Sequence, residues 1–244
     1  MQSVKRGYLS WTTETVRRVP GVLSGSSRGF RSGSIRAGYF DFDLYVQDPG
    51  HQQRAVDTFV TGIQWLMRKR PVDLLVFIKK NDVDDSSTVG LLPLASSISS
   101  NEELWLPYVI VRLDRPVFDR VKTGPDVVGS APLQGRNAVV LVDHVTSGEE
   151  IYETVTTLRD LGAKVQAAMT FAIWLKDFET KQFKGRLLEL DVELLYFNAL
   201  EERELAGGKK VEVALVGNEK WLTELDEILE SEWEGSVPKL AYAR

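Results

Sequence analysis

The fold is decided by the stretch Ala138-Val139-Val140-Leu141-Val142-Asp143-His144-Val145-Thr146-Ser147-Gly148-Glu149-Glu150-Ile151. It begins as an apolar strand, passes through an acidic turn, and ends at the start of a helix. Backbone N–H groups at a helix start bind phosphate, so this layout is typical of a site for a phosphorylated sugar. The stretch therefore predicts a buried strand with a ligand-binding turn at its carboxyl end.

The same turn also has the pattern of a capping box, with Ser147 as N-cap and Glu150 reaching back to its N–H. In that arrangement, side chains at the start of the helix accept hydrogen bonds from its free N-terminal N–H groups. Carboxylates at Glu149 and Glu150 would repel a phosphate by several kcal/mol at ~4 Å and an effective dielectric of ~20, whereas a helix N-terminus contributes about one or two. The pattern predicts that phosphate is excluded unless the glutamates point away.

His144 has two interpretations. Imidazole exchanges protons near neutral pH, so His144 is a candidate general base. No partner for it is visible in the sequence, which favours the alternative of a hydrogen-bonded structural residue.

Strands and helices alternate along the chain, which predicts a single α/β domain with a central, mainly parallel sheet flanked by helices. We expect the central strands at 73–78, 108–112 and 137–142, with Asp143 at the carboxyl edge of the sheet, where such sheets bind ligands. Residues 114–136 lack periodicity and are predicted to form a long loop, either a mobile lid or a disordered hairpin. Further strands are predicted at 38–45, 165–175 and 211–215, a strand and turn at 187–200, and helices at 56–67, 91–98, 149–161 and 220–233.

The predicted organisation is one domain over residues 1–200, including an N-terminal hood-like segment at 1–50. A C-terminal extension of strand and helix, residues 201–244, is expected to pack on it.

The composition excludes several kinds of site. The chain has no cysteine and two histidines, so disulfides, thiolate catalysis, cysteine–zinc sites and a site built from histidines alone are excluded. No segment approaches the roughly 18 apolar residues of a membrane span and no secretory signal is visible, so we expect a cytoplasmic protein without membrane partners. A net charge of −5 argues against a nucleic-acid partner, although the first forty residues are locally basic.

Several segments follow one another in the order and spacing of a known family. They are Arg31-Ser32-Gly33, Tyr39-Phe40-Asp41, the segments 90–95 and 109–112, Val128 to Arg136, and the segments 158–165 and 188–194. Together they cover residues 19–200 and resemble orotate phosphoribosyltransferase, of the type I phosphoribosyltransferase family. The resemblance implies that family's α/β fold, phosphoribosyl diphosphate and orotate as ligands, magnesium as cofactor if the protein is active, and a dimer whose long loop enters the neighbouring site.

The resemblance also implies roles for individual residues. Asp143 would act on the ribose, and a cation of the 114–122 loop, Arg115 or Lys122, would take part in catalysis. The implied ligand-binding residues are Arg31, Ser32, Tyr39, Phe40, Arg112, His144, Thr146, Ser147, Gly148 and Glu149.

Three departures from the family's pattern fall on separate parts of its mechanism. Leu113 stands where the family has a lysine, His144 replaces the second acid, and Glu149 stands in the phosphate loop. They favour a catalytically impaired or inactive protein that senses a nucleotide-like ligand or acts as an assembly or interaction subunit, as a homodimer or with a related chain. The alternative is an active orotate phosphoribosyltransferase that forms orotidine monophosphate.

Overall fold

The computed structural model describes most of the central part of the chain. Side chains are described for residues 42–79, 90–113, 127–145, 148–174, 187 and 189–198, and the backbone also for 23–24, 28–29, 35–36, 39–40, 80, 126, 199–204 and 211–217. The predicted helix at 220–233 lies outside these residues. Among the helices of these ranges, none combines the length and the apolar character that a bilayer crossing requires.

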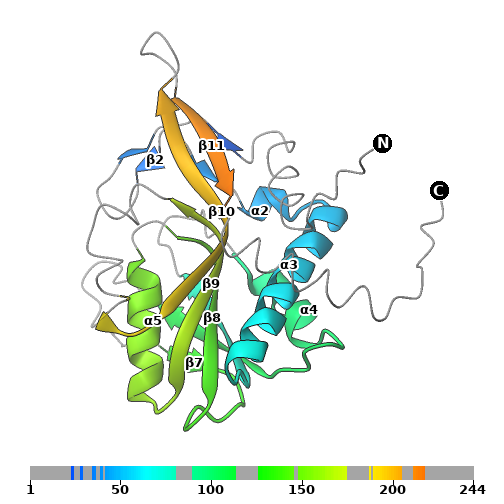
Figure 1. Ribbon diagram of the computed structural model, residues 1–244, viewed down its shortest axis with the longest axis vertical. Helices are drawn as coiled ribbons and strands as arrows, with labels where there is room; N and C mark the ends of the chain where they lie inside the picture. Colours follow the sequence, from blue (N-terminus) through cyan, green and yellow to red (C-terminus); the bar gives the residue numbers. More distant parts are fainter. Residues whose placement is uncertain are drawn as a thin grey trace, which may run out of the picture.

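Within the described residues, a seven-stranded sheet forms the centre of the molecule, in the order β11-β10-β9-β8-β5-β6-β7 (Figure 1). Its strands are β5 (Leu74–Lys80), β6 (Tyr108–Leu113), β7 (Asp126–Val128), β8 (Asn137–Val145), β9 (Lys164–Trp174), β10 (Glu193–Glu204) and β11 (Val211–Gly217). The five inner strands run parallel, and β7 and β11 pair antiparallel at the two edges. This arrangement confirms the α/β class, the mainly parallel sheet and the inner position of residues 137–142.

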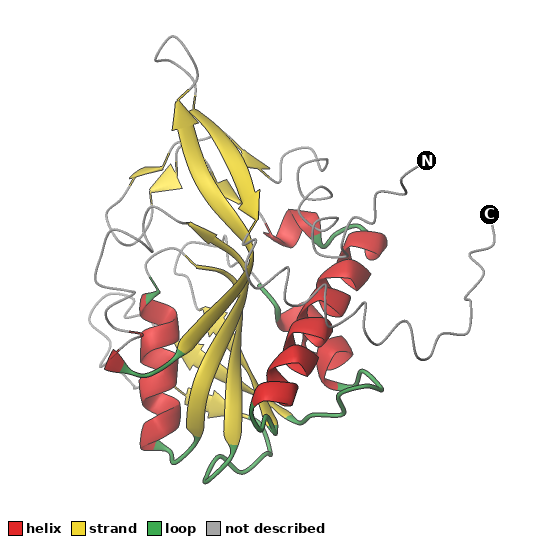
Figure 2. Cartoon of the chain, in the orientation of Figure 1, coloured by secondary structure: helices red, strands yellow, loops and turns green. Residues whose placement is uncertain are grey.

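Helices cover both faces of this sheet (Figure 2). One face packs against α3 (Pro49–Lys69) and α4 (Ala95–Ser99), and the other packs against α5 (Glu149–Asp160). Val139 and Leu141 of β8 belong to the core on the α3 side, whereas Val140 and Val142 belong to the core on the α5 side. Because both faces are covered, the strand reads as a continuous apolar run rather than an alternating one.

The sequence predicted α3 from the apolar positions at 56–67, with a basic C-terminus at residues 68–70; the structure confirms this end, and the helix begins earlier, at Pro49. Asp48 is its N-cap and accepts a hydrogen bond from the His51 N–H at 3.0 Å, and Pro49 occupies the first turn. Arg68 and Lys69 lie in the last turn, where cations favour the carbonyl end of a helix. The Asp-Pro-Gly segment, which looked like the end of a strand, is therefore the start of this helix.

The strand predicted at 38–45 is wrong over most of its length. The strand expected at 38–45 is instead β4 (Tyr39–Phe40), paired with β1 (Leu23–Ser24), followed by the helical turn α2 (Phe42–Tyr45). Alternating aromatic residues fit a strand, but Phe42 and Tyr45 are spaced to share one helical face, and both rings contact Phe171.

The structure also corrects the long loop expected at 114–136. Its residues 126–128 form β7, which pairs antiparallel with β6 at the sheet edge. Residues 114–125, with Arg115 and Lys122, lie outside the described part of the chain, so the predicted lid remains a prediction. At the C-terminal side, β10 runs past residue 200 and β11 joins it in the same sheet. A second small pair, β2 (Arg28–Gly29) with β3 (Ile35–Arg36), lies in the segment expected to form the hood.

Tyr45 gives a first testable prediction. Its ring is fully buried and stacks on His51, and its hydroxyl has no hydrogen-bond partner among the described residues. Burial raises the pKa of Tyr45 well above its ordinary value near 10. An unsatisfied buried hydroxyl is unfavourable by about 1–3 kcal/mol, so Tyr45→Phe should leave stability at pH 7 unchanged or raise it by about 1 kcal/mol. Above pH ~10 the unfolded phenol loses its proton while the buried one keeps it, so the wild-type free energy of unfolding should fall by up to ~1.4 kcal/mol per pH unit.

Urea denaturation at neutral and alkaline pH measures both effects. The difference between Tyr45→Phe and wild type should widen at alkaline pH, because the variant lacks this ionisation. A variant less stable than wild type at pH 7 would contradict the assignment of an unsatisfied hydroxyl.

Candidate functional site

The candidate site lies at the carboxyl end of β8, the middle strand of the sheet. Parallel α/β sheets bind ligands at this edge, in the turns that lead from strands to helices. The strand ends with Asp143, His144 and Val145, and α5 begins at Glu149. The sequence predicted this placement, and the structure confirms it.

Asp143 and His144 form a buried pair. The side chains are 4% and 8% exposed, and His144 Nδ1 lies 2.9 Å from Asp143 Oδ2. In a regular strand, neighbouring side chains point to opposite faces, so this bond could not be expected from the sequence. His144 therefore has a partner that sequence reasoning missed, and the interpretation of a hydrogen-bonded histidine is supported. Thr170 of β9 lies behind the pair and donates weakly to the Asp143 carbonyl at 3.4 Å and to that of Ala172 at 2.9 Å.

Gly90 and Asp43 are two site residues that sequence reasoning did not single out. The Gly90 N–H donates to Asp43 Oδ1 at 3.1 Å, which ties α2 to the turn before the 3-10 helix η1 (Leu92–Leu94). Gly90 has φ +58, and a Cβ built on it would lie 3.6 Å from both Cγ and Oδ2 of Asp143. A glycine here leaves a methyl-sized space in front of the carboxylate. The hydrogen bond between Gly90 and Asp43 joins residues 47 positions apart, so no local pattern could have revealed it.

Strand register pairs two cations near the carboxyl ends of β5 and β6. Lys79 of β5 pairs with Arg112 of β6, and both side chains are exposed. Leu141 and Phe77 are partners across β8 and β5 and face α3, and this pairing ends two residues before Asp143 and Lys79. Arg112 follows Ile110 on the same face, two strands or about 10 Å away from β8. Lys79 therefore lies at the same edge of the sheet as Asp143, and the sequence analysis did not single it out.

The start of α5 differs from the predicted capping box. The N-cap is Gly148, with φ +71 and no side-chain cap, and the Tyr152 N–H bonds to the Gly148 carbonyl at 3.0 Å. Ser147 and Thr146 lie outside the described residues, so their predicted contacts are not placed. Glu149 is exposed and Glu150 is half-buried. The N-cap is therefore Gly148 and not Ser147.

Leu113 is part of the protein core. It is 3% exposed and packs with the apolar cluster on the α5 side of the sheet. The position at which the resemblance implies a lysine therefore supplies packing. Of the other implied residues, Tyr39 and Phe40 are placed as backbone in β4, and Arg31 and Ser32 lie outside the described residues.

Magnesium is held in proteins by one or two carboxylates together with substrate phosphates. Within the described residues no group of three His, Cys, Asp or Glu side chains could hold a metal ion, and Asp143 Oδ2 is bonded to His144. This part of the chain does not build a magnesium site of its own.

Comparison with solved structures found proteins of the same architecture. The orotate phosphoribosyltransferase of Aeropyrum pernix superposes with a TM-score of 0.56 at 20% identity, covering 77% of this chain and 92% of the other. The chain has the phosphoribosyltransferase fold. A Mycobacterium tuberculosis H37Rv orotate phosphoribosyltransferase in complex with phosphoribosyl diphosphate gives 0.52 at 15% identity, with 79% and 96% covered, and an adenine phosphoribosyltransferase gives 0.50 at 16%, with 75% and 99% covered.

These structures confirm, at the level of the fold, the resemblance drawn from the sequence. Identities this low do not carry the activity over, because one fold hosts many functions. No protein-family model matches the sequence, and the comparison with curated proteins found no match.

Proposed function

We propose that the protein binds a nucleoside 5′-monophosphate or a similar ribose phosphate at the end of β8 and does not transfer phosphoribosyl groups to orotate. In this proposal it acts as a nucleotide sensor or as an assembly subunit. The observation that carries it is the Asp143–His144 pair, which retains one carboxylate for ribose hydroxyls and has an imidazole where the resembled family has a second acid.

The surroundings of the pair support ligand binding. Gly148 is the N-cap of α5 and has no side chain of its own to bond the first N–H groups, and N–H groups at a helix start bind phosphate. Lys79 and Arg112 are like charges directly opposite each other on neighbouring strands, which is unfavourable unless an anion lies near them. A ribose phosphate would offer hydroxyls to Asp143 and negative charge to these cations.

The loss of turnover is inferred from Leu113. A catalytic cation at this position would have to project from the strand end, whereas Leu113 points into the core with 3% exposure. The alternative function is an active orotate phosphoribosyltransferase. In that case Arg115 or Lys122 would supply the catalytic cation in place of the residue at 113. The Lys79–Arg112 pair is the observation that favours this alternative, since it supplies positive charge for a diphosphate.

The proposal includes a two-fold partner, either a second copy or a related chain, whose 114–125 segment approaches this site. Cytoplasmic location and the absence of a nucleic-acid partner remain expectations from the sequence.

Calorimetry with two glycine variants tests the binding site. Uridine 5′-monophosphate, phosphoribosyl diphosphate and orotate are titrated into the protein, each with and without magnesium, and orotate-dependent release of pyrophosphate is measured separately. Gly90→Ala fills the space in front of Asp143, so we expect nucleotide affinity to fall by about tenfold or more, or ~1.4 kcal/mol.

Gly135→Ala is the matched control. Gly135 also has a left-handed backbone, φ +76, but a Cβ there meets no atom within 4 Å. Both variants should lose about 1–2 kcal/mol of stability from backbone strain, and only Gly90→Ala should lose affinity. Pyrophosphate release with orotate would replace the proposal by the active enzyme, and no heat with any of the three compounds would overturn the binding site itself.

A further inference from the structure

The strands β8 and β9 both change face beside the candidate site. In a regular strand, residues three apart lie on opposite faces of the sheet. Val142 and Val145 of β8 nevertheless both belong to the core on the α5 side. In β9 the consecutive residues Phe171 and Ala172 both belong to the core on the α3 side. Each strand therefore holds one irregularity, of the kind that re-aims side chains next to active sites.

The two irregularities lie at the same level of the sheet. The register of β8 with β9 has the same offset before and after them, at Val142↔Thr170 and at Val145↔Ile173. The residues of β8 between these pairs are Asp143–His144, whose side chains lie 2.9 Å apart between Oδ2 and Nδ1. The change of face thus explains how two consecutive residues of one strand come to lie side by side.

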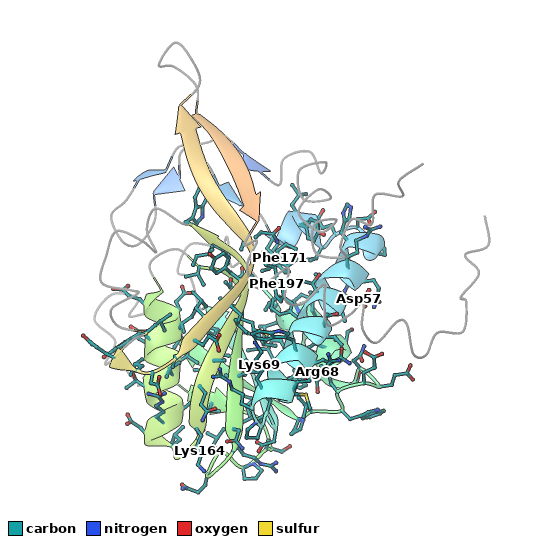
Figure 3. All side chains as sticks on the ribbon, viewed as in Figure 1. Asp57, Arg68, Lys69, Lys164, Phe171 and Phe197 are labelled. Atoms are coloured by element: carbon teal, nitrogen blue, oxygen red, sulfur yellow. The ribbon has the colours of Figure 1, made fainter. Side chains whose placement is uncertain are left out.

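Buried hydrogen-bonding side chains gather at this level. Six polar or charged residues of the described part of the chain are buried, and four of them lie here, namely Asp143, His144, Thr170 and Asn198. Thr170 donates to the Ala172 carbonyl at 2.9 Å and shares its single hydroxyl proton with the Asp143 carbonyl at 3.4 Å. Asn198 of β10 donates from Nδ2 to the carbonyl of Phe171, which is labelled in Figure 3, at 2.9 Å. Side chains of β9 and β10 thus bond the backbone where the two strands change face.

We propose that Thr170 is a positioning residue of the ligand site. Its side chain is fully buried, so it acts through its neighbours and not on a ligand. Its hydroxyl holds the backbone of β8 and β9 where both strands change face, and this keeps the Asp143 carboxylate and the His144 imidazole in contact. Ribose hydroxyls then meet a carboxylate of fixed orientation. The ligand step of this inference rests on the proposed function, whereas the geometry of the pair does not.

Imidazole NMR spectra test the geometry without a ligand. The chain has two histidines, so a His51→Gln variant assigns the resonances of the other. In the wild type we expect the His144 Nδ1–H proton far downfield, as for an N–H group that donates to a carboxylate. Thr170→Val removes the hydroxyl and keeps the branched shape, so this proton should move upfield or exchange with water. Thr170→Ser keeps the hydroxyl and should retain the wild-type resonance.

Thr58→Val is the matched control. Thr58 is also fully buried, and its hydroxyl also donates to a backbone carbonyl, that of Arg54 at 2.7 Å, but this bond lies within α3. Both valine variants lose a buried hydroxyl, and only Thr170→Val should alter the His144 spectrum. An unchanged Nδ1–H resonance in Thr170→Val, or a wild type without the downfield proton, would overturn the proposal. If Thr170→Val does not fold, Thr170→Ala serves the same test, because the smaller side chain fits the same space without a hydroxyl.

Calorimetry extends the test to the ligand. Thr170→Val should weaken binding of uridine 5′-monophosphate by about tenfold and Thr170→Ser by about threefold or less, whereas Thr58→Val should bind as the wild type does. If the wild type binds no nucleotide, the proposed function fails, and the NMR comparison still decides whether Thr170 holds the pair. A changed His144 spectrum in Thr170→Val with unchanged nucleotide affinity would overturn the positioning role for the ligand.

Discussion

Replacing Phe171 by alanine is expected to lower the free energy of unfolding by about 3–5 kcal/mol. Phe171 of β9 is fully buried, and its ring lies 5.1 Å from Phe42, 5.3 Å from Tyr45 and 6.4 Å from Phe59, measured between ring centroids. It therefore joins α2 and α3 to the sheet (Figure 3). Removing the ring loses its burial and leaves a cavity that three neighbouring rings cannot readily fill.

Urea denaturation measures the loss, and two variants serve as controls. Phe171→Leu keeps most of the side-chain volume and should recover more than half of the stability. Met67→Ala removes an apolar side chain of similar size from an exposed position and should change stability by about 0.5 kcal/mol or less. A loss below about 1 kcal/mol for Phe171→Ala would show that this cluster does not hold the helices on the sheet.

The strands and helices that the sequence predicted correctly are those whose burial leaves a periodic trace. β8 is covered on both faces, so residues 138–142 form an unbroken apolar run. On α5, Ile151, Val155 and Leu158 are buried at helical spacing against one face. In both elements the local pattern and the tertiary environment require the same residues, so the sequence alone was sufficient.

The errors arose where one local pattern fits two structures. Residues 42–45 alternate as in a strand, but their aromatic residues also share a helical face. Packing of that face against Phe171 stabilises the helix. At α5, the capping-box pattern predicted Ser147 as N-cap, and the following glycine takes that position with a left-handed backbone.

The site was predictable only in its location. The carboxyl end of the middle strand follows from the order of strands and helices. The surroundings of Asp143 come from elsewhere: Gly90, in the turn before η1, lies in front of the carboxylate, and the Gly90 N–H bonds to Asp43. These contacts join residues dozens of positions apart, so they exist only once the fold has formed.

Asp143→Asn is expected to weaken binding of uridine 5′-monophosphate by about 1.5–3 kcal/mol, or about ten- to a hundredfold. A carboxylate accepts a charge-assisted hydrogen bond from a ribose hydroxyl, whereas the amide is neutral and has one acceptor oxygen. The variant keeps the side-chain shape, and its amide oxygen can still accept from His144, so the fold should be retained. The loss of affinity would then report on the ligand contact.

The decisive comparison uses 2′,3′-dideoxyuridine 5′-monophosphate, which lacks both hydroxyls. Wild type should bind it about as weakly as Asp143→Asn binds the ribonucleotide, and the substitution should leave its affinity unchanged, because the contact is already missing. His144→Asn removes the imidazole beside the same carboxylate and should reduce the preference for the ribonucleotide by less than Asp143→Asn does. If Asp143→Asn weakens both nucleotides equally, Asp143 supports the site without contacting the ribose, and the function proposed for the β8 turn must be abandoned.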